Sequence, residues 1–160
     1  MHLFFEPRSV VLIGTSRQTG PGAYNNLEML LSYGYPGRIH LVHPKVPDIM
    51  GYKTCPRVAG LPEVPDLAVI SLGRERVLDA AVECARHGIK RLVVISQGFA
   101  DADARGAELQ AELVSLAREH GVRVLGPNTM GVLNPFYGFT TAFIDVPRDP
   151  RPAPLTMVAQ

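Results

Sequence analysis

The chain has 160 residues, the size of one domain, and 46% of them are hydrophobic, which is enough to bury a single core. Its 16 basic and 15 acidic residues leave a formal net charge of +1, which excludes the strong overall field that favours nucleic acid or an anionic membrane. Because Cys55 and Cys84 have no metal-ligand spacing and no long apolar run opens the chain, the sequence predicts a reduced, cytoplasmic protein without a signal peptide or membrane helix.

Apolar runs recur along the chain and predict buried strands. The runs have no polar alternation, which is typical of strands covered on both faces in a parallel sheet. They occupy residues 10–13, 39–42, 67–72, 92–95 and 122–125.

Helical spacing of apolar residues fills most of the intervals between these strands. The predicted helices cover residues 23–33, 75–87 and 104–120, and the last two end at Gly88 and Gly121. Alternating strands and helices predict an α/β fold, a Rossmann-like doubly wound three-layer domain with a mainly parallel sheet. Residues 44–65 break the alternation, and we expect a loop there with a short helix near Val58.

Prolines mark the end of the predicted domain. Four of the eight residues from Pro147 to Pro154 are proline, a composition that suits an extended tether. We therefore expect a domain over residues 1–144, a Pro-rich linker over 145–154, and the start of a following, truncated domain at 155–160.

A glycine-rich turn, GTSRQTGPG, follows the first predicted strand at residues 14–22. Glycines let backbone N–H groups approach an anion, and the next helix would point its positive dipole end at that anion. Five residues separate Gly14 from Gly20, so the turn departs from G-x-G-x-x-G. The turn is interpreted either as a phosphate cradle, with hydrogen bonds from Thr15 and Ser16 and charge from Arg17, or as a flexible connection.

Lys45 follows the second predicted strand, within the sequence His43, Pro44, Lys45. A dinucleotide-binding fold that recognises a free ribose 2′-hydroxyl places a carboxylate there, roughly 20 residues after the glycines. A lysine instead favours a phosphorylated ribose, as in NADP or coenzyme A. The alternative is a solvated lysine.

Other polar residues near strand ends suit binding better than catalysis. Ser96 and Asn128 could donate hydrogen bonds to a ligand, whereas Asp101 and Asp103 are interpreted as caps of the third helix. No nucleophile accompanied by a base, and no metal-ligand pattern, stands in the sequence.

The ordered motifs resemble the coenzyme A-binding domain of NDP-forming (ADP-forming) acyl-CoA synthetases, which are related to the succinyl-CoA synthetase α subunit. The motifs are FFEPRSVVLIGTSRQTGPG, HPK, MGYKTCPRVAGLPEVPDLAVISL, VVISQGFAD and VLGPNTMGVLNP. The resemblance implies that coenzyme A is the cofactor and that its phosphates lie against the glycine loop. The residues implied are Gly14, Thr15, Ser16, Arg17, Gly20, Gly22, His43, Pro44, Lys45, Ser71, Leu72, Gly73, Ser96, Gln97, Gly98, Pro127 and Asn128.

The chain departs from the family pattern at two places. Thr129 stands where many members carry cysteine, and none of the five histidines matches the family's phosphorylated histidine. The resemblance therefore implies a domain that binds CoA or acyl-CoA, works with ligase and ATP-grasp domains in cis or in trans, and is not active alone. A homodimer is possible, and nucleic acid and membranes are not expected as partners. The alternatives are an NADP-binding oxidoreductase domain and a stand-alone CoA-sensing regulatory module.

Overall fold

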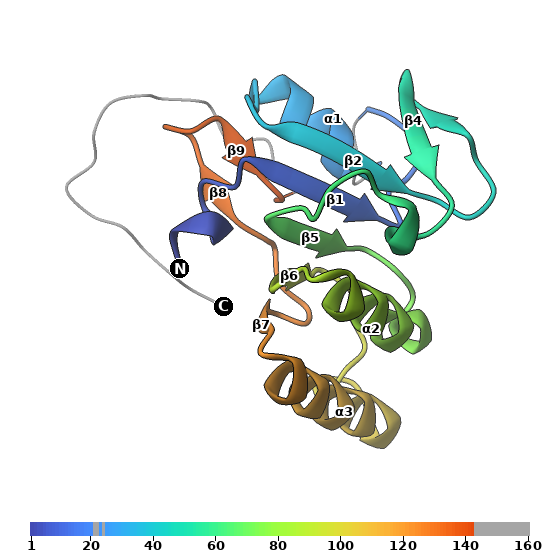
Figure 1. Ribbon diagram of the computed structural model, residues 1–160. Coiled ribbons are helices and arrows are strands. Elements are labelled where there is room, and N and C mark those ends of the chain that lie inside the picture. The colour runs from blue at the N-terminus through green and yellow to red at the C-terminus, as the bar shows by residue number, and fades with distance from the viewer. Residues whose placement is uncertain (21–22, 24, 143–160) are drawn as a thin grey trace.

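The structure, a computed structural model, describes residues 1–20, 23 and 25–142. Its main sheet has seven strands in the order β3-β4-β2-β1-β5-β6-β7. Every neighbouring pair is parallel except β3 and β4, so the arrowheads of β1, β2 and β5 point the same way in Figure 1. The predicted mainly parallel sheet is confirmed. The strands are β1 (Ser9–Ile13), β2 (Arg38–Val42), β3 (Asp48–Ile49), β4 (Tyr52–Cys55), β5 (Leu67–Ile70), β6 (Arg91–Val94) and β7 (Arg123–Leu125).

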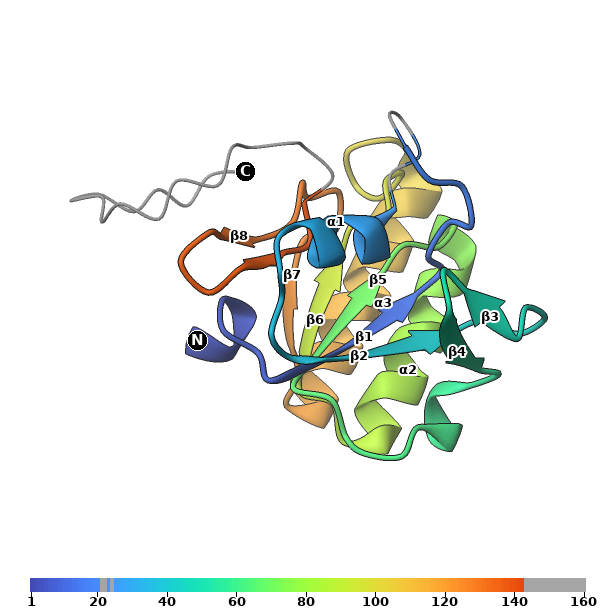
Figure 2. The ribbon, with the colours of Figure 1, turned by 90° about the horizontal axis from the view of Figure 1, so that it is seen from above.

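Helices cover both faces of this sheet, as the doubly wound prediction requires. Figures 1 and 2 show α1 (Asn26–Ser32) on one side of the sheet and α2 (Val77–His87) and α3 (Ala104–His120) on the other. A small hairpin of β8 (Leu133–Asn134) and β9 (Phe139–Thr140) joins α1 on its side. Single 3₁₀ turns occupy His2–Phe4, Val58–Gly60 and Arg74–Arg76.

The core has two halves, one on each face of the sheet. In β1, Val11 and Ile13 pack with the α2 and α3 side, whereas Val10 and Leu12 pack with the α1 side. Successive side chains of a strand point to opposite faces. Because both faces are covered, all five residues of β1 are buried, and this explains its uninterrupted apolar sequence.

The two long helices end at the predicted glycines, whereas α2 begins at Val77 after a 3₁₀ turn and Asp101 accepts from the Phe99 N–H instead of capping α3. Asp103 caps α3 by accepting a hydrogen bond from the Gly106 N–H at 2.7 Å. Gly88 and Gly121 close α2 and α3 with φ of 98° and 61°, a backbone region that favours glycine. The first helix is shorter than predicted, because Asn25 caps it and helical structure begins only at Asn26.

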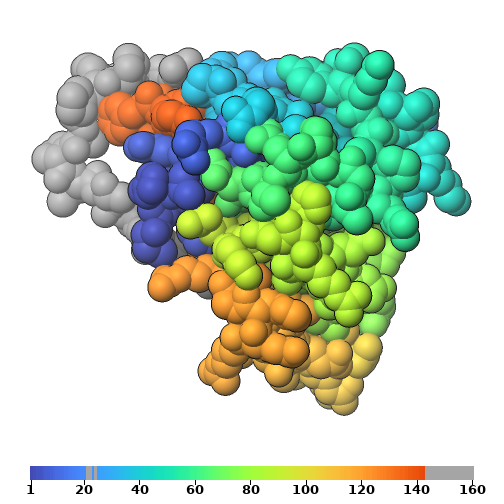
Figure 3. Space-filling model, viewed as in Figure 1, coloured from blue at the N-terminus to red at the C-terminus, as the bar shows by residue number. Residues whose placement is uncertain are grey.

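The connection after β2 differs from the predicted loop. It contains the ribbon of β3 and β4, and β4 extends the sheet by pairing with β2 in parallel. Such short strands leave too few residues for a periodic pattern, so only the turn at Val58 was predictable. Figure 3 shows this ribbon in teal at the upper right and the α3 region in orange at the bottom of the molecule.

The predicted domain end, linker and following segment lie outside the described residues, from 143 onward. Among the residues that are described, no helix is long and apolar enough to cross a membrane.

Candidate functional site

A cavity of about 580 Å³ lies at the carboxyl ends of the central strands. The chain leaves β1 for a helix on one face and leaves β5 for a helix on the other, so these two neighbouring strand ends flank a topological switch point. Ligands of open α/β sheets bind at such a point. We call this space the switch-point cavity. Seven of the sequence-predicted residues line it: Gly14, Thr15, His43, Pro44, Lys45, Ser71 and Leu72.

Gly14 sits against the end of the neighbouring strand β5. A Cβ added to Gly14 would stand 2.4 Å from the Ser71 carbonyl oxygen and 2.6 Å from a methyl carbon of Leu72. Gly14 also has φ of +87°, which L side chains rarely adopt. Only glycine therefore fits where the loop leaves β1 and enters the floor of the cavity.

Thr15 lines the cavity and carries a buried hydroxyl group without a partner in the described part of the chain. The residue is 6% exposed, and its Oγ1 finds no hydrogen-bond partner among the described residues. A buried, unsatisfied hydroxyl costs free energy, so one that lines a cavity suits a polar ligand atom.

Lys45 reaches the cavity from a turn that His43 stabilises. The His43 Nδ1 accepts hydrogen bonds from the backbone N–H groups of Lys45 at 3.2 Å and Val46 at 3.0 Å. The Lys45 ammonium is exposed and makes no ion pair with any described residue. It is therefore free to attract an anion.

The remainder of the glycine loop is held by α1. Asn25 donates from Nδ2 to the Ser16 and Gln18 carbonyls, while its Oδ1 accepts from two amides of the first turn of α1. The Gly20 N–H donates to both carboxylate oxygens of Glu28, at 3.1 and 2.9 Å. The N–H groups of Gly20, Leu27 and Glu28 therefore already donate to acceptors within the chain. We had expected N–H groups at the start of this helix to be open to a phosphate. Ser16, Arg17 and Gly20 do not line the switch-point cavity, and Gly22 lies outside the described residues.

The predicted residues after β6 and β7 link neighbouring loops and do not line this cavity. The Ser96 hydroxyl accepts from the Leu72 N–H at 3.1 Å, and the Ser96 carbonyl accepts from the Asn128 N–H at 2.9 Å. Asn128 also donates from its side chain to Asp101 at 3.0 Å. These bonds place the edge residues Gly73, Ser96, Gln97, Gly98, Pro127 and Asn128 beside the cavity but outside its lining.

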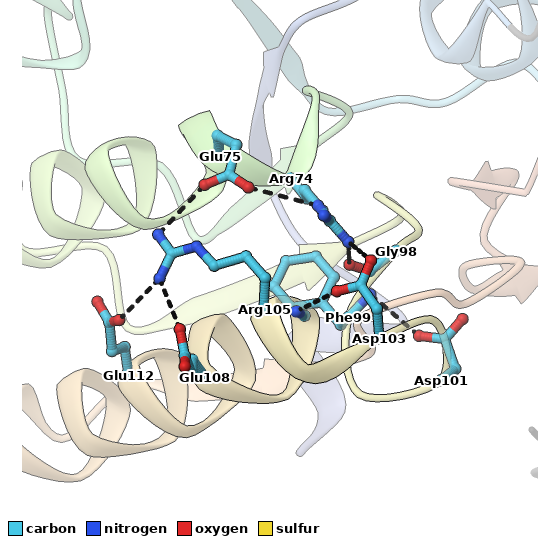
Figure 4. Close-up of polar contacts among 10 residues, drawn as sticks. Arg74, Glu75, Gly98, Phe99, Asp101, Asp103, Arg105, Glu108 and Glu112 are labelled. Atoms are coloured by element: carbon cyan, nitrogen blue, oxygen red, sulfur yellow. Dashed lines mark hydrogen bonds and ion pairs between the residues drawn. The ribbon is translucent and has the colours of Figure 1, made fainter.

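Arg74 ties two of these loops together (Figure 4). Its Nη1 donates to the Gly98 carbonyl at 2.9 Å and to the Asp103 carboxylate at 2.7 Å. The Arg74 guanidinium, helped by the Gly106 N–H, holds the pKa of Asp103 below its ordinary value. The charged N-cap of α3 is therefore also an anchor for the loop after β5.

Several cavity residues were not predicted from the sequence. Pro56 and Arg57 come from the segment after β4, which enters the site only because β4 pairs with β2. The others form one stripe of the second helical region, with spacing that could have indicated a shared face: Arg76, Asp79, Ala80 and Glu83. In the described part of the chain, no group of three or more His, Cys, Asp or Glu side chains could hold a metal ion.

Comparison with known proteins identifies the family. Residues 8–135 match the CoA binding domain family. The chain is 38% identical over 139 residues to acetate–CoA ligase (ADP-forming) II of Archaeoglobus fulgidus, covering 87% of this chain and 21% of that protein. It is 33% identical over 167 residues to the α subunit of acetate–CoA ligase (ADP-forming) I of Pyrococcus furiosus, covering 100% of this chain and 35% of the subunit.

A solved structure supports the same assignment. The fold superposes with a TM-score of 0.82 and 35% identity on dinucleotide-forming acetyl-coenzyme A synthetase 1 of Ca. Korarchaeum cryptofilum, solved with phosphate and ADP; the match covers 92% of this chain and 31% of that chain. The chain thus spans about a third or less of these relatives. These matches support coenzyme A and give no support to the NADP or regulatory alternatives. The chain belongs to the CoA-binding domain family, as a coenzyme A-binding domain of the kind found in ADP-forming acyl-CoA synthetases.

Proposed function

We propose that the switch-point cavity binds the nucleotide end of coenzyme A. The observation that carries this proposal is the convergence of Gly14, Thr15 and Lys45 on one cavity at a topological switch point. Together they provide a close backbone approach, and a hydroxyl and a cation that have no partner among residues 1–20, 23 and 25–142. Coenzyme A carries a diphosphate and a phosphorylated ribose. Their oxygens suit the backbone and the hydroxyl, and their negative charges suit the cation.

The pantetheine arm would leave the cavity along the carboxyl edge of the sheet. Ser71 and Leu72 follow β5, which lies between β1 and β6 in the sheet, and Ser96, Gly98 and Asn128 lie in the loops after β6 and β7. The hydrogen bonds among these loops keep the edge in one conformation. The thiol at the end of the arm supplies the nucleophile that accepts an acyl group. The described residues present no nucleophile–base arrangement of their own, so we propose that acyl transfer requires ligase and ATP-grasp domains, in cis or in trans.

Calorimetric titration of the 160-residue chain tests the binding step. We expect coenzyme A to bind with one site per chain, 3′-dephospho-coenzyme A to bind more weakly, and NADPH not to bind. No heat with coenzyme A would overturn the proposal. Tighter binding of NADPH than of coenzyme A would favour the oxidoreductase alternative.

A partner experiment tests the role in a ligase. Mixing the chain with an ADP-forming acetate–CoA ligase from which the matching CoA-binding domain has been deleted, and assaying acetyl-CoA formation with ATP, acetate and coenzyme A, would show whether the domain works in trans. The alternative of a regulatory module predicts a change in oligomeric state when coenzyme A binds, which gel filtration with and without the ligand detects.

A further inference from the structure

Three cations from separate segments line the switch-point cavity. Lys45 follows β2, Arg57 follows β4 and Arg76 precedes α2, so they come from three separate segments. All three are exposed, and none forms an ion pair with a described residue. Elsewhere arginines are paired, such as Arg38 with Glu63 and Arg105 with Glu75. The three cations at the cavity are thus available to an anionic ligand there.

Two carboxylates on α2 limit where phosphate can sit. Asp79 and Glu83 also line the cavity, and neither forms an ion pair among the described residues. Glu83 accepts a hydrogen bond from the Val58 N–H at 3.4 Å, which directs its carboxylate from α2 toward the turn that follows Arg57. Glu83 stands seven positions beyond Arg76, roughly 10 Å along a helix axis, whereas Asp79 lies in the first turn of α2. Repulsion by these carboxylates favours phosphate groups at the strand ends rather than along α2.

Arg57 and Lys45 stand at the ends of neighbouring strands. Val42 of β2 is in register with Cys55 of β4, and parallel neighbours lie about 4.8 Å apart. Lys45 and Arg57 follow this pair by three and two residues, on the same edge. Both side chains line the cavity at this edge, which makes them candidates for contact with the same phosphate group.

Arg76 stands at the other side of the cavity. Its Nη2 lies 4.0 Å from the position that a Cβ on Gly73 would occupy, just beyond β5. This places the guanidinium by the switch point, where Gly14 and Thr15 also lie. A phosphate group at the switch point is therefore a different one from the group between Lys45 and Arg57.

We propose that Arg57 acts with Lys45 to recognise the 3′-phosphate of coenzyme A, and that Arg76 binds the diphosphate beside Thr15. This assignment rests on the proposed function, because it divides the phosphates of the ligand named there. The planar guanidinium can donate two parallel hydrogen bonds to one phosphate, which makes arginine well suited to both positions.

Calorimetry with two ligands and three variants separates the two roles. The ligands are coenzyme A and 3′-dephospho-coenzyme A, and the variants are Arg57→Gln, Arg76→Gln and the control Arg86→Gln. Arg86 is exposed on α2, makes no ion pair among the described residues and does not line the cavity. Circular dichroism melting of each variant verifies that it is folded.

We expect Arg57→Gln to weaken coenzyme A roughly 10-fold and to leave 3′-dephospho-coenzyme A unchanged, since a charge-assisted hydrogen bond is lost only with the former. Arg76→Gln should weaken both ligands by a similar factor, and Arg86→Gln neither. If the unchanged chain binds coenzyme A but Arg57→Gln weakens both ligands equally, or neither, the assignment of Arg57 is wrong. If Arg76→Gln leaves both affinities unchanged, the assignment of Arg76 is wrong. Failure of the unchanged chain to bind coenzyme A would instead overturn the proposed function.

Discussion

Gly14 and Ser71 approach so closely that no side chain fits between them: a Cβ on Gly14 would stand 2.4 Å from the Ser71 carbonyl oxygen. The contact joins the carboxyl ends of β1 and β5, the two strands at the switch point. It brings the glycine loop onto the floor of the cavity beside Thr15. The same contact therefore contributes to the stability of the fold and to the shape of the site.

Gly14→Ala is expected to destabilise the chain by more than about 3 kcal/mol, because overpacking against backbone adds to the cost of positive φ. The control is Gly121→Ala at the end of α3, where φ is +61° and an added Cβ meets nothing within 4 Å. That control should cost only about 1 kcal/mol. Urea denaturation of both variants gives the two free energies of unfolding, and equal losses would contradict the close contact.

Thr15→Val is expected to stabilise the free chain by about 1 kcal/mol and to weaken coenzyme A binding roughly 5-fold, because the unused hydroxyl is removed. Thr141→Val is the matched control. The Thr141 hydroxyl is fully buried and accepts from the Val132 N–H at 2.8 Å, so its loss should destabilise by about 1–3 kcal/mol. Thermal melting and calorimetry measure the two effects. A destabilised Thr15→Val variant would show that its hydroxyl has a partner within the chain.

The ionisation of Glu63 makes the free energy of unfolding of the chain depend on pH. Hydrogen bonds from Arg38 and then from His40 lower the pKa of Glu63 from 4.5 to about 2. Because the pKa is lowered in the folded state, the stabilisation is present above pH 4.5 and is lost as the pH falls toward 2.

Glu63→Gln should therefore be less stable than the unchanged chain at pH 7, with the difference shrinking between pH 5 and pH 2. Glu119→Gln, at an exposed glutamate on α3 that forms no ion pair with a described residue, should follow the unchanged chain throughout. Unfolding free energies measured across this pH range check the prediction. A constant difference between Glu63→Gln and the unchanged chain would refute it.

The two cysteines should differ sharply in reactivity. Burial raises the pKa of the Cys84 thiol to about 12, and its side chain lies in the core beneath α2. Cys55 is only partly buried, and its thiol donates to the Gly60 carbonyl. At pH 8 a disulfide reagent should label one thiol per native chain and two in denaturant, since only a thiolate that the reagent can reach reacts. Labelling that persists in Cys55→Ser at the native rate would contradict this assignment.

The sequence predicted the long-range plan of the fold better than its short elements. The strand at 10–13 was predictable because burial on two faces leaves an uninterrupted apolar run, and the helix at 104–120 because one apolar stripe leaves a helical period. The β3–β4 ribbon was not, because strands of two and four residues carry almost no pattern. The predicted first helix was too long, because apolar spacing does not reveal that Asn25 caps the helix and that α1 begins at Asn26.

The residues of the candidate site likewise divide into those that the sequence predicted and those that it did not. Gly14, Thr15 and Lys45 were predictable, because the residues that follow buried parallel strands must share one edge of the sheet. Arg57 was not predictable, because its place in the site depends on β4 joining β2. The spacing of Arg76 with Asp79 and Glu83 indicates a shared face, but it does not show that this face borders the cavity. The placement of coenzyme A against particular residues remains a prediction.

The sequence by itself determined the class of fold, the cofactor family and the strand ends at which a ligand would bind, because these follow from local periodicity and from motifs read in order. Only the tertiary structure decided which groups meet in the cavity, which amides of the glycine loop already have partners and which cations have none. Those properties depend on distances between segments far apart in the chain, such as Gly14 with Ser71, and no local pattern records them.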